Sequence, residues 1–136
     1  GWGSELTTEI TPMEAGLDRF VDFSKCFLGR EATLSRKLLG VNTKLVYVSV
    51  ETADSDCLGN ETVLNPEAPS GKNIIGVTTS GAYGHTVSQS MAFAYVQPKF
   101  AEPGTKLEIR VLGHNCSATV LKEAAYDPQN LRLRDV

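Results

Sequence analysis

The sequence lacks the features that mark several large classes of protein. None of its apolar runs approaches the ~20 residues that a membrane-spanning helix needs, and its first residues show neither the basic nor the apolar region of a signal peptide. Thirteen Lys and Arg stand against sixteen Asp and Glu, with the signs mixed along the chain, so the basic stripe typical of nucleic-acid binding is missing. We therefore expect neither a membrane nor a nucleic acid as a partner.

Cysteine and histidine are also scarce. The three cysteines are widely spaced and odd in number, which favours a reducing compartment over a disulfide framework. The two histidines, His85 and His114, show no metal-ligand spacing, so no metal site is predicted. A nucleophile elbow is missing too, and we predict no catalytic residue here. What remains is one modest domain of 136 residues, 41% hydrophobic and 21% charged, which is enough for a core.

The first forty residues carry helix signals. Thr11 and Glu14 form a capping box with a proline in the first turn, and apolar residues then recur on one face, which predicts a helix of about two turns. Gly16 inside it indicates a close packing contact, because glycine weakens a helix. A second helix is predicted over residues 29–39, with its leucines toward the core and Gly40 as its end.

Beyond Gly40 the apolar residues recur with the period of two that is typical of strands. Five runs bounded by Gly, Pro or Asn predict strands over residues 44–51, 73–78, 91–97, 105–112 and 118–122. We expect residues 51–72 to form a long loop or a hairpin excursion, and residues 131–133 to form a short final strand. The predicted fold is mainly β, a small antiparallel barrel or sandwich preceded by two short helices that belong to an adjoining domain.

One stretch, residues 76–86, is unusual in its composition. It holds three glycines, several hydroxyl groups, Tyr83 and His85 directly after a predicted strand. We interpret it as a loop that either builds a turn with its hydroxyls or approaches a ligand closely. The glycine spacing does not match a dinucleotide or phosphate-binding fingerprint.

Two charged residues near the predicted helices have open roles. Lys25 lies at the junction of the two helices, where its ammonium group meets an anionic ligand or points into water. Glu14 is the acid of the capping box and is either purely structural or part of a site.

Several stretches together carry a resemblance to a known family. They are residues 9–17, 27–32, 76–85, 90–96 and 103–105, which follow one another in order over nearly the whole chain. They resemble the C-terminal part of the glycine-cleavage T-protein (aminomethyltransferase) family. The Gly-His-Thr version of the 76–86 stretch is most similar to the folate-binding half of sarcosine and dimethylglycine dehydrogenases, and of the pyruvate dehydrogenase phosphatase regulatory subunit.

The resemblance implies a domain organisation and a cofactor. Tetrahydrofolate sits in the centre of a three-domain ring in that family and accepts a one-carbon unit from an aminomethyl donor or a small methylated amine. Residues 1–40 would end the middle domain and residues 41–136 would form the closing barrel. The acids that steer the transfer and hold the pterin would precede this chain, which is then inactive alone. A dehydrogenase-like parent would also bind FAD in its N-terminal part. Relatives are mitochondrial in animals, in the matrix, and cytoplasmic in bacteria.

The resemblance also selects candidate cofactor-binding residues. The basic residue that meets the folate in that family falls at about Lys25, and Arg30 would add a second countercharge for the polyanionic folate tail. Glu14, Tyr83 and His85 complete the predicted cofactor-binding set.

Two other functions stay open. The same fold can serve as a non-catalytic regulatory domain whose barrel surface contacts a protein partner. The third hypothesis is a stand-alone small barrel that binds a ligand. In such a protein the two predicted helices would have no surface to pack on.

Overall fold

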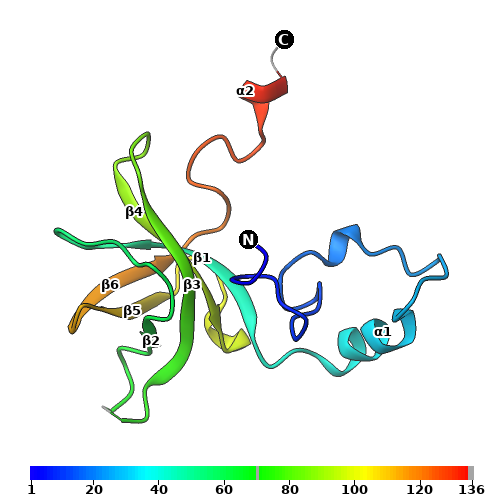
Figure 1. The fold of residues 1–136 in the computed structure, drawn as a ribbon. Helices are drawn as coiled ribbons and strands as arrows, with labels where there is room; N and C mark the ends of the chain where they lie inside the picture. The colour runs from blue at the N-terminus through cyan, green and yellow to red at the C-terminus, as the bar shows by residue number, and fades with distance from the viewer. Residues whose placement is uncertain (70, 135–136) are drawn as a thin grey trace.

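The computed structural model describes residues 1–69 and 71–134, and a closed antiparallel β-barrel forms its centre (Figure 1). Its strands are β1 (Lys44–Val50), β2 (Thr62–Leu64), β3 (Ile74–Gly84), β4 (Gln89–Val96), β5 (Lys106–Val111) and β6 (His114–Val120). Around the barrel they follow the order β1-β4-β3-β2-β5-β6, and β6 pairs back onto β1. The predicted small antiparallel barrel is thus confirmed.

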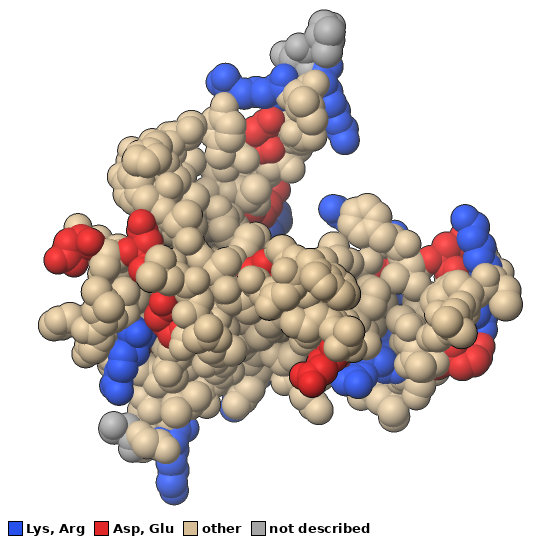
Figure 2. Space-filling model, in the orientation of Figure 1, with Lys and Arg blue, Asp and Glu red and all other residues tan. Residues whose placement is uncertain are grey.

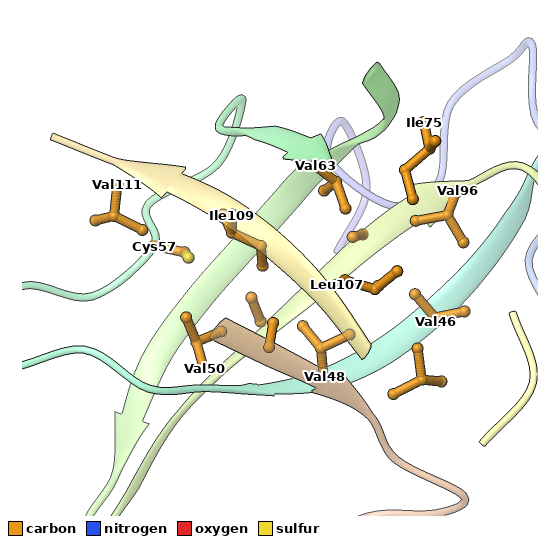
Figure 3. Close-up of a cluster of buried hydrophobic side chains, with 14 residues drawn as sticks. Val46, Val48, Val50, Cys57, Val63, Ile75, Val96, Leu107, Ile109 and Val111 are labelled. Atoms are coloured by element: carbon orange, nitrogen blue, oxygen red, sulfur yellow. The ribbon is translucent and has the colours of Figure 1, made fainter. Parts of the chain in front are cut away.

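Alternation of apolar and polar residues explains why the strands close on a core. In β5, Leu107, Ile109 and Val111 point inward and are buried, while Lys106 and Arg110 are exposed. The equivalent inward residues of the other strands meet them in one cluster (Figure 3). Each such aliphatic side chain contributes about 1.5–3 kcal/mol when fully buried, so the barrel holds most of the apolar stabilisation.

The stretch over residues 76–86 is mostly strand, so the prediction of a loop there is wrong. Residues 76–84 make up all of β3 except its first two residues, and they pair with β4 as far as Gly84, opposite Gln89. A Cβ on Gly76 would collide with the carbonyl oxygen of Tyr95, and one on Gly81 would lie 2.5 Å from the carbonyl oxygen of Cys57. These glycines therefore allow close backbone approach within the barrel rather than a flexible loop.

Of the two alternatives for residues 51–72, the structure shows the hairpin excursion, because the stretch holds the short strand β2, which pairs antiparallel with the start of β3 and also borders β5. One other prediction beyond Gly40 is wrong. The predicted final strand is instead a single helical turn, α2 (Leu131–Arg134). The Asp127 carboxylate accepts hydrogen bonds from the backbone N–H groups of Leu131 at 2.8 Å and Arg132 at 3.0 Å, which stabilises this turn. A 3₁₀ turn, η2 (Pro98–Phe100), links β4 to β5.

The predicted first helix does not form, although its capping contacts do. The backbone of residues 11–17 makes one turn, in which the Ala15 N–H bonds the Thr11 carbonyl and the Leu17 N–H bonds the Pro12 carbonyl. Gly16 then takes φ +68°, which ends the turn. A Cβ there would meet no described atom within 4 Å, so Gly16 serves backbone geometry and not the predicted packing contact. A 3₁₀ turn, η1 (Asp18–Phe20), follows.

The second predicted helix is confirmed as α1 (Arg30–Leu39), and Gly40 ends it with φ +84°. Its leucines do not face a core, contrary to the prediction: Leu38 and Leu39 are exposed, as is Leu28 just before the helix. Residues 1–40 form an arm that carries α1 away from the barrel (Figure 1). In the described part of the chain, no helix is long and apolar enough to cross a membrane.

Candidate functional site

An open cleft lies at the start of α1, at the outer end of the arm. Residues 24–32 line it and enclose about 470 Å³. Lys25 and Arg30 both belong to this lining, so the structure brings these two predicted residues together. Figure 2 shows basic and acidic side chains side by side over this end of the molecule.

The two cations of the cleft are held differently. Arg30 donates from Nε to the Phe23 carbonyl at 2.9 Å and pairs through Nη1 with Glu31, which fixes the plane of its guanidinium. Lys25 is exposed, with Nζ 3.6 Å from Asp22 Oδ2. Hydrogen bonds from the Ser24 hydroxyl and backbone N–H hold the pKa of Asp22 below its usual value, so this carboxylate stays charged beside Lys25. Arg30 is thus held by two contacts, whereas exposed Lys25 has only a longer ion pair with Asp22.

The ring of Phe27 lines the cleft together with the two cations, and Phe23 lies next to it. The rings of Phe23 and Phe27 lie 6.2 Å apart, and Lys37 Nζ lies 5.1 Å from the centroid of Phe23. A second hollow of about 380 Å³ shares Lys25 and Phe27 with the cleft and adds Phe20. Two cations beside apolar ring faces can bind a ligand that joins carboxylates to an aromatic group.

Glu14 lies outside this cleft and is 2% exposed. Its Oε1 accepts a hydrogen bond from Arg36 Nη1 at 2.9 Å. Its Oε2 accepts from the Thr11 backbone N–H at 3.1 Å and from the Thr11 hydroxyl. Protein groups therefore engage both carboxylate oxygens.

Tyr83 and His85 lie together but apart from the cleft. Their rings meet edge to face with centroids 5.1 Å apart, where β3 turns into β4. The end of that hairpin and α1 project on opposite sides of the barrel (Figure 1). Within the described chain, then, the five predicted cofactor-binding residues fall into three separate places.

Glu5 is a buried acid that the sequence analysis missed. It is 7% exposed, and its Oε1 accepts hydrogen bonds from the hydroxyls of Thr79 at 2.6 Å and Ser80 at 2.5 Å. Its other oxygen contacts the Gly1 amino group, and its backbone carbonyl accepts from the Tyr95 hydroxyl at 2.7 Å. Burial alone would raise the pKa of Glu5, but these bonds to the carboxylate outweigh it and lower the pKa to about 2. This cluster fastens the arm to β3 and β4.

The contacts of Glu5 explain why pattern reasoning did not find it. Its hydroxyl partners lie more than seventy positions away in the sequence. The one available signal was the run of hydroxyl residues inside an otherwise apolar strand, because such groups need a partner when they are buried.

A metal site finds no support in residues 1–69 and 71–134, where His, Cys, Asp and Glu side chains nowhere gather in groups of three that could hold an ion.

Comparison with known proteins gives consistent matches. A family model described as the glycine cleavage T-protein C-terminal barrel domain matches residues 44–127. Mitochondrial dimethylglycine dehydrogenase of Rattus norvegicus is 39% identical over 137 residues, which cover 98% of this chain and 15% of that protein. An aminomethyltransferase of Rippkaea orientalis is 34% identical over 131 residues, which cover 95% of this chain and 34% of that protein.

A solved structure matches in three dimensions as well. The glycine cleavage system aminomethyltransferase T from Bartonella henselae superposes with a TM-score of 0.79 at 25% identity, over 90% of this chain and 34% of that one. The chain thus spans between about a seventh and a third of the length of these relatives.

Proposed function

Because the chain belongs to the glycine cleavage T-protein C-terminal barrel family, we propose that it closes the tetrahydrofolate site of a longer one-carbon transferase or amine dehydrogenase. Barrels of this family occur in aminomethyltransferases and in dimethylglycine dehydrogenases. The reaction would move a one-carbon unit from an aminomethyl donor or a small methylated amine to the folate. A dehydrogenase parent would carry FAD in another domain.

One observation carries the proposal: Lys25 and Arg30 line the same cleft. The glutamate tail of a folate is a string of carboxylates, and charge-assisted bonds to oriented cations are among the stronger polar contacts. Arg30, whose guanidinium is held in one plane, would bind one carboxylate of the tail, and the exposed ammonium group of Lys25 would pair with another. The neighbouring Phe27 ring offers a surface for the benzoyl group.

The same cleft is too open to bind a folate alone. Small-molecule sites commonly bury most of their ligand, and this one is a shallow surface at the end of an arm. We therefore propose that other parts of a longer polypeptide hold the pterin and carry the catalytic acid. The chain by itself is inactive in this account. Tyr83 and His85 lie at the end of the β3–β4 hairpin, on the side of the barrel opposite α1 (Figure 1). That they contact the cofactor stays a prediction.

The arm supports the proposed domain organisation. Leu28, Leu38, Leu39 and Phe20 are exposed along it, which is a large apolar surface for a short segment. We propose that residues 1–40 complete a neighbouring domain whose apolar residues cover this surface, and that residues 41–136 form the barrel domain. The compartment would be the mitochondrial matrix in an animal and the cytoplasm in a bacterium.

The exposed apolar arm also favours a second candidate, a non-catalytic domain of the same fold that contacts a regulatory protein partner. This candidate predicts that the longer polypeptide binds its protein partner and does not bind folate.

Titration calorimetry with tetrahydrofolate on the longer polypeptide tests the proposal. We expect Lys25→Met and Arg30→Met each to weaken binding about tenfold, because each removes a charge-assisted contact worth about 1.5 kcal/mol. Lys106→Met, at an exposed lysine on β5, is the matched control and should bind like the wild type. Unchanged affinity in both cleft variants would refute the assignment of the tail to this cleft.

A further inference from the structure

We infer that the ion pair between Glu14 and Arg36 is the positioning device of the cleft: it sets the direction of α1 and so holds Arg30 in place beside Lys25. Glu14 then acts on the ligand through α1 and does not touch it. The identity of the ligand rests on the proposed function, but the control of α1 by this pair does not.

The contacts of Glu14 make it a junction between the barrel and α1. Its backbone carbonyl accepts a hydrogen bond at 2.8 Å from the N–H of Leu45, in the second position of β1. Its carboxylate bonds Arg36 in the last turn of α1, as well as Thr11. One buried residue is thereby tied to the barrel by its backbone and to the helix by its side chain.

Among the described residues, the other side-chain contacts of α1 reach only the segment just before it: Arg30 bonds the Phe23 carbonyl, and Lys37 lies over the Phe23 ring. Every residue of α1 is exposed or half-buried, and its ten residues are too few for a stable isolated helix in water. The side chain of Arg36 is 44% exposed, but its carboxylate partner is 3% exposed. An ion pair with one buried member is costly to break, because the buried carboxylate would be left without its cation.

A small tilt of α1 at the ion pair would displace Arg30 in the cleft. Arg36 lies six positions after Arg30, which is about 9 Å along a helix axis. A tilt of about 20° around Arg36 would move Arg30 by about 3 Å, which exceeds the tolerance of a hydrogen bond. The pair therefore decides whether the two cations of the cleft can bind one ligand together.

Hydrogen exchange on the 136-residue chain tests whether the ion pair between Glu14 and Arg36 holds α1 in place. Arg36→Met and Glu14→Gln should each raise the exchange rates of the amides over residues 34–39 by tenfold or more, while the strand amides keep their rates. The double variant should exchange no faster than the faster single variant, because both changes break one interaction. Arg36→Lys keeps the charge and should restore part of the protection. Arg110→Met, at an exposed arginine on β5, is the control.

To test whether the pair affects ligand binding, we choose a ratio of two affinities, which a general loss of stability would leave unchanged. In the longer polypeptide, we compare the affinities for tetrahydrofolate with one and with three glutamates. The wild type should bind the triglutamate at least tenfold more tightly, and Arg36→Met should lose most of this ratio while its barrel melts at the same temperature.

These experiments distinguish a failure of the proposed folate binding from a failure of the inferred role of the ion pair. A wild type that binds neither folate would refute the proposed function, and the exchange experiment would still decide the role of the pair. Wild-type exchange rates in Arg36→Met, or additive effects in the double variant, would overturn the inference. So would an Arg36→Met protein that keeps the full triglutamate ratio while its α1 amides exchange fast. If Glu14→Gln fails to fold, Arg36→Met and Arg36→Lys carry the test alone, since Arg36 is half-exposed.

Discussion

Replacing Glu5 by glutamine should loosen the attachment of the arm to the barrel. The change keeps the shape of the side chain but removes the charge that pairs with the Gly1 amino group and that the hydroxyls of Thr79 and Ser80 bond at 2.6 and 2.5 Å. Hydrogen bonds to a charged group contribute about 1.5–3 kcal/mol each, and the amide oxygen of glutamine retains part of that. We expect Glu5→Gln to lower the free energy of unfolding at pH 7 by about 2 kcal/mol.

The dependence of this loss on pH follows from the pKa of Glu5. The carboxyl titrates near pH 4.5 when unfolded and at about 2 when folded, so the folded state favours the charged form. Its contribution is fully present above pH 4.5 and disappears as the pH falls toward 2. Wild type and Glu5→Gln should therefore differ at pH 7 and converge near pH 2.

The assay is urea unfolding followed by far-ultraviolet circular dichroism at pH 7, 4 and 2.5. Glu102→Gln, at an exposed glutamate in the turn before β5, is the matched control and should unfold like the wild type. A midpoint for Glu5→Gln that equals the wild type at pH 7, or a difference that stays constant down to pH 2.5, would refute the reasoning.

Three further changes test the barrel. Gly76→Ala should abolish folding or lower the melting temperature strongly, because its Cβ would collide with the Tyr95 carbonyl oxygen; a protein that melts like the wild type would show that the strands can part there. Ile109→Ala should cost about 2–5 kcal/mol in urea unfolding, whereas Leu112→Ala, at an exposed position, should cost less than about 0.5 kcal/mol. Equal losses in these two would contradict the assigned core. Tyr95→Phe should cost about 1 kcal/mol through the lost bond to the Glu5 carbonyl, and should speed amide exchange over residues 1–6; unchanged exchange would show that this bond does not hold the arm.

Local patterns predicted the parts of the fold that local interactions determine. The alternation of Leu107, Ile109 and Val111 identifies β5 because burial on one face of a strand has a period of two. Gly40 ends α1 as predicted because its positive φ is a property of a single residue. The strand β2 has only three residues, too short for a period to show, and the barrel partners β3 and β5 create it.

Errors arose where distant partners decide the outcome. The capping contacts of Thr11 and Glu14 form, but Gly16 takes φ +68° and ends the turn, and the second carboxylate oxygen of Glu14 bonds Arg36, more than twenty positions later. The glycines at 76 and 81 suggested a loop, because their close neighbours Tyr95 and Cys57 cannot be known from local sequence.

The candidate site could be predicted only in its sequence-local part. Lys25 and Arg30 lie five positions apart at a helix start, so local geometry places them near each other, but the contact of α1 with the distant Glu14 was not predictable from local sequence. Glu5 has partners on β3, and its burial depends on how the arm crosses the barrel. Contacts of that kind need the three-dimensional structure.

We propose that this chain forms one wall of a folate site and that other parts of a longer polypeptide form the rest of it. The most direct measurement is the dissociation constant of tetrahydrofolate for the 136-residue chain and for the longer polypeptide, by titration calorimetry under the same conditions. We predict tight binding by the longer polypeptide and at least a hundredfold weaker binding by the chain alone. Equally tight binding by the chain alone, or no binding by the longer polypeptide, would contradict the claim.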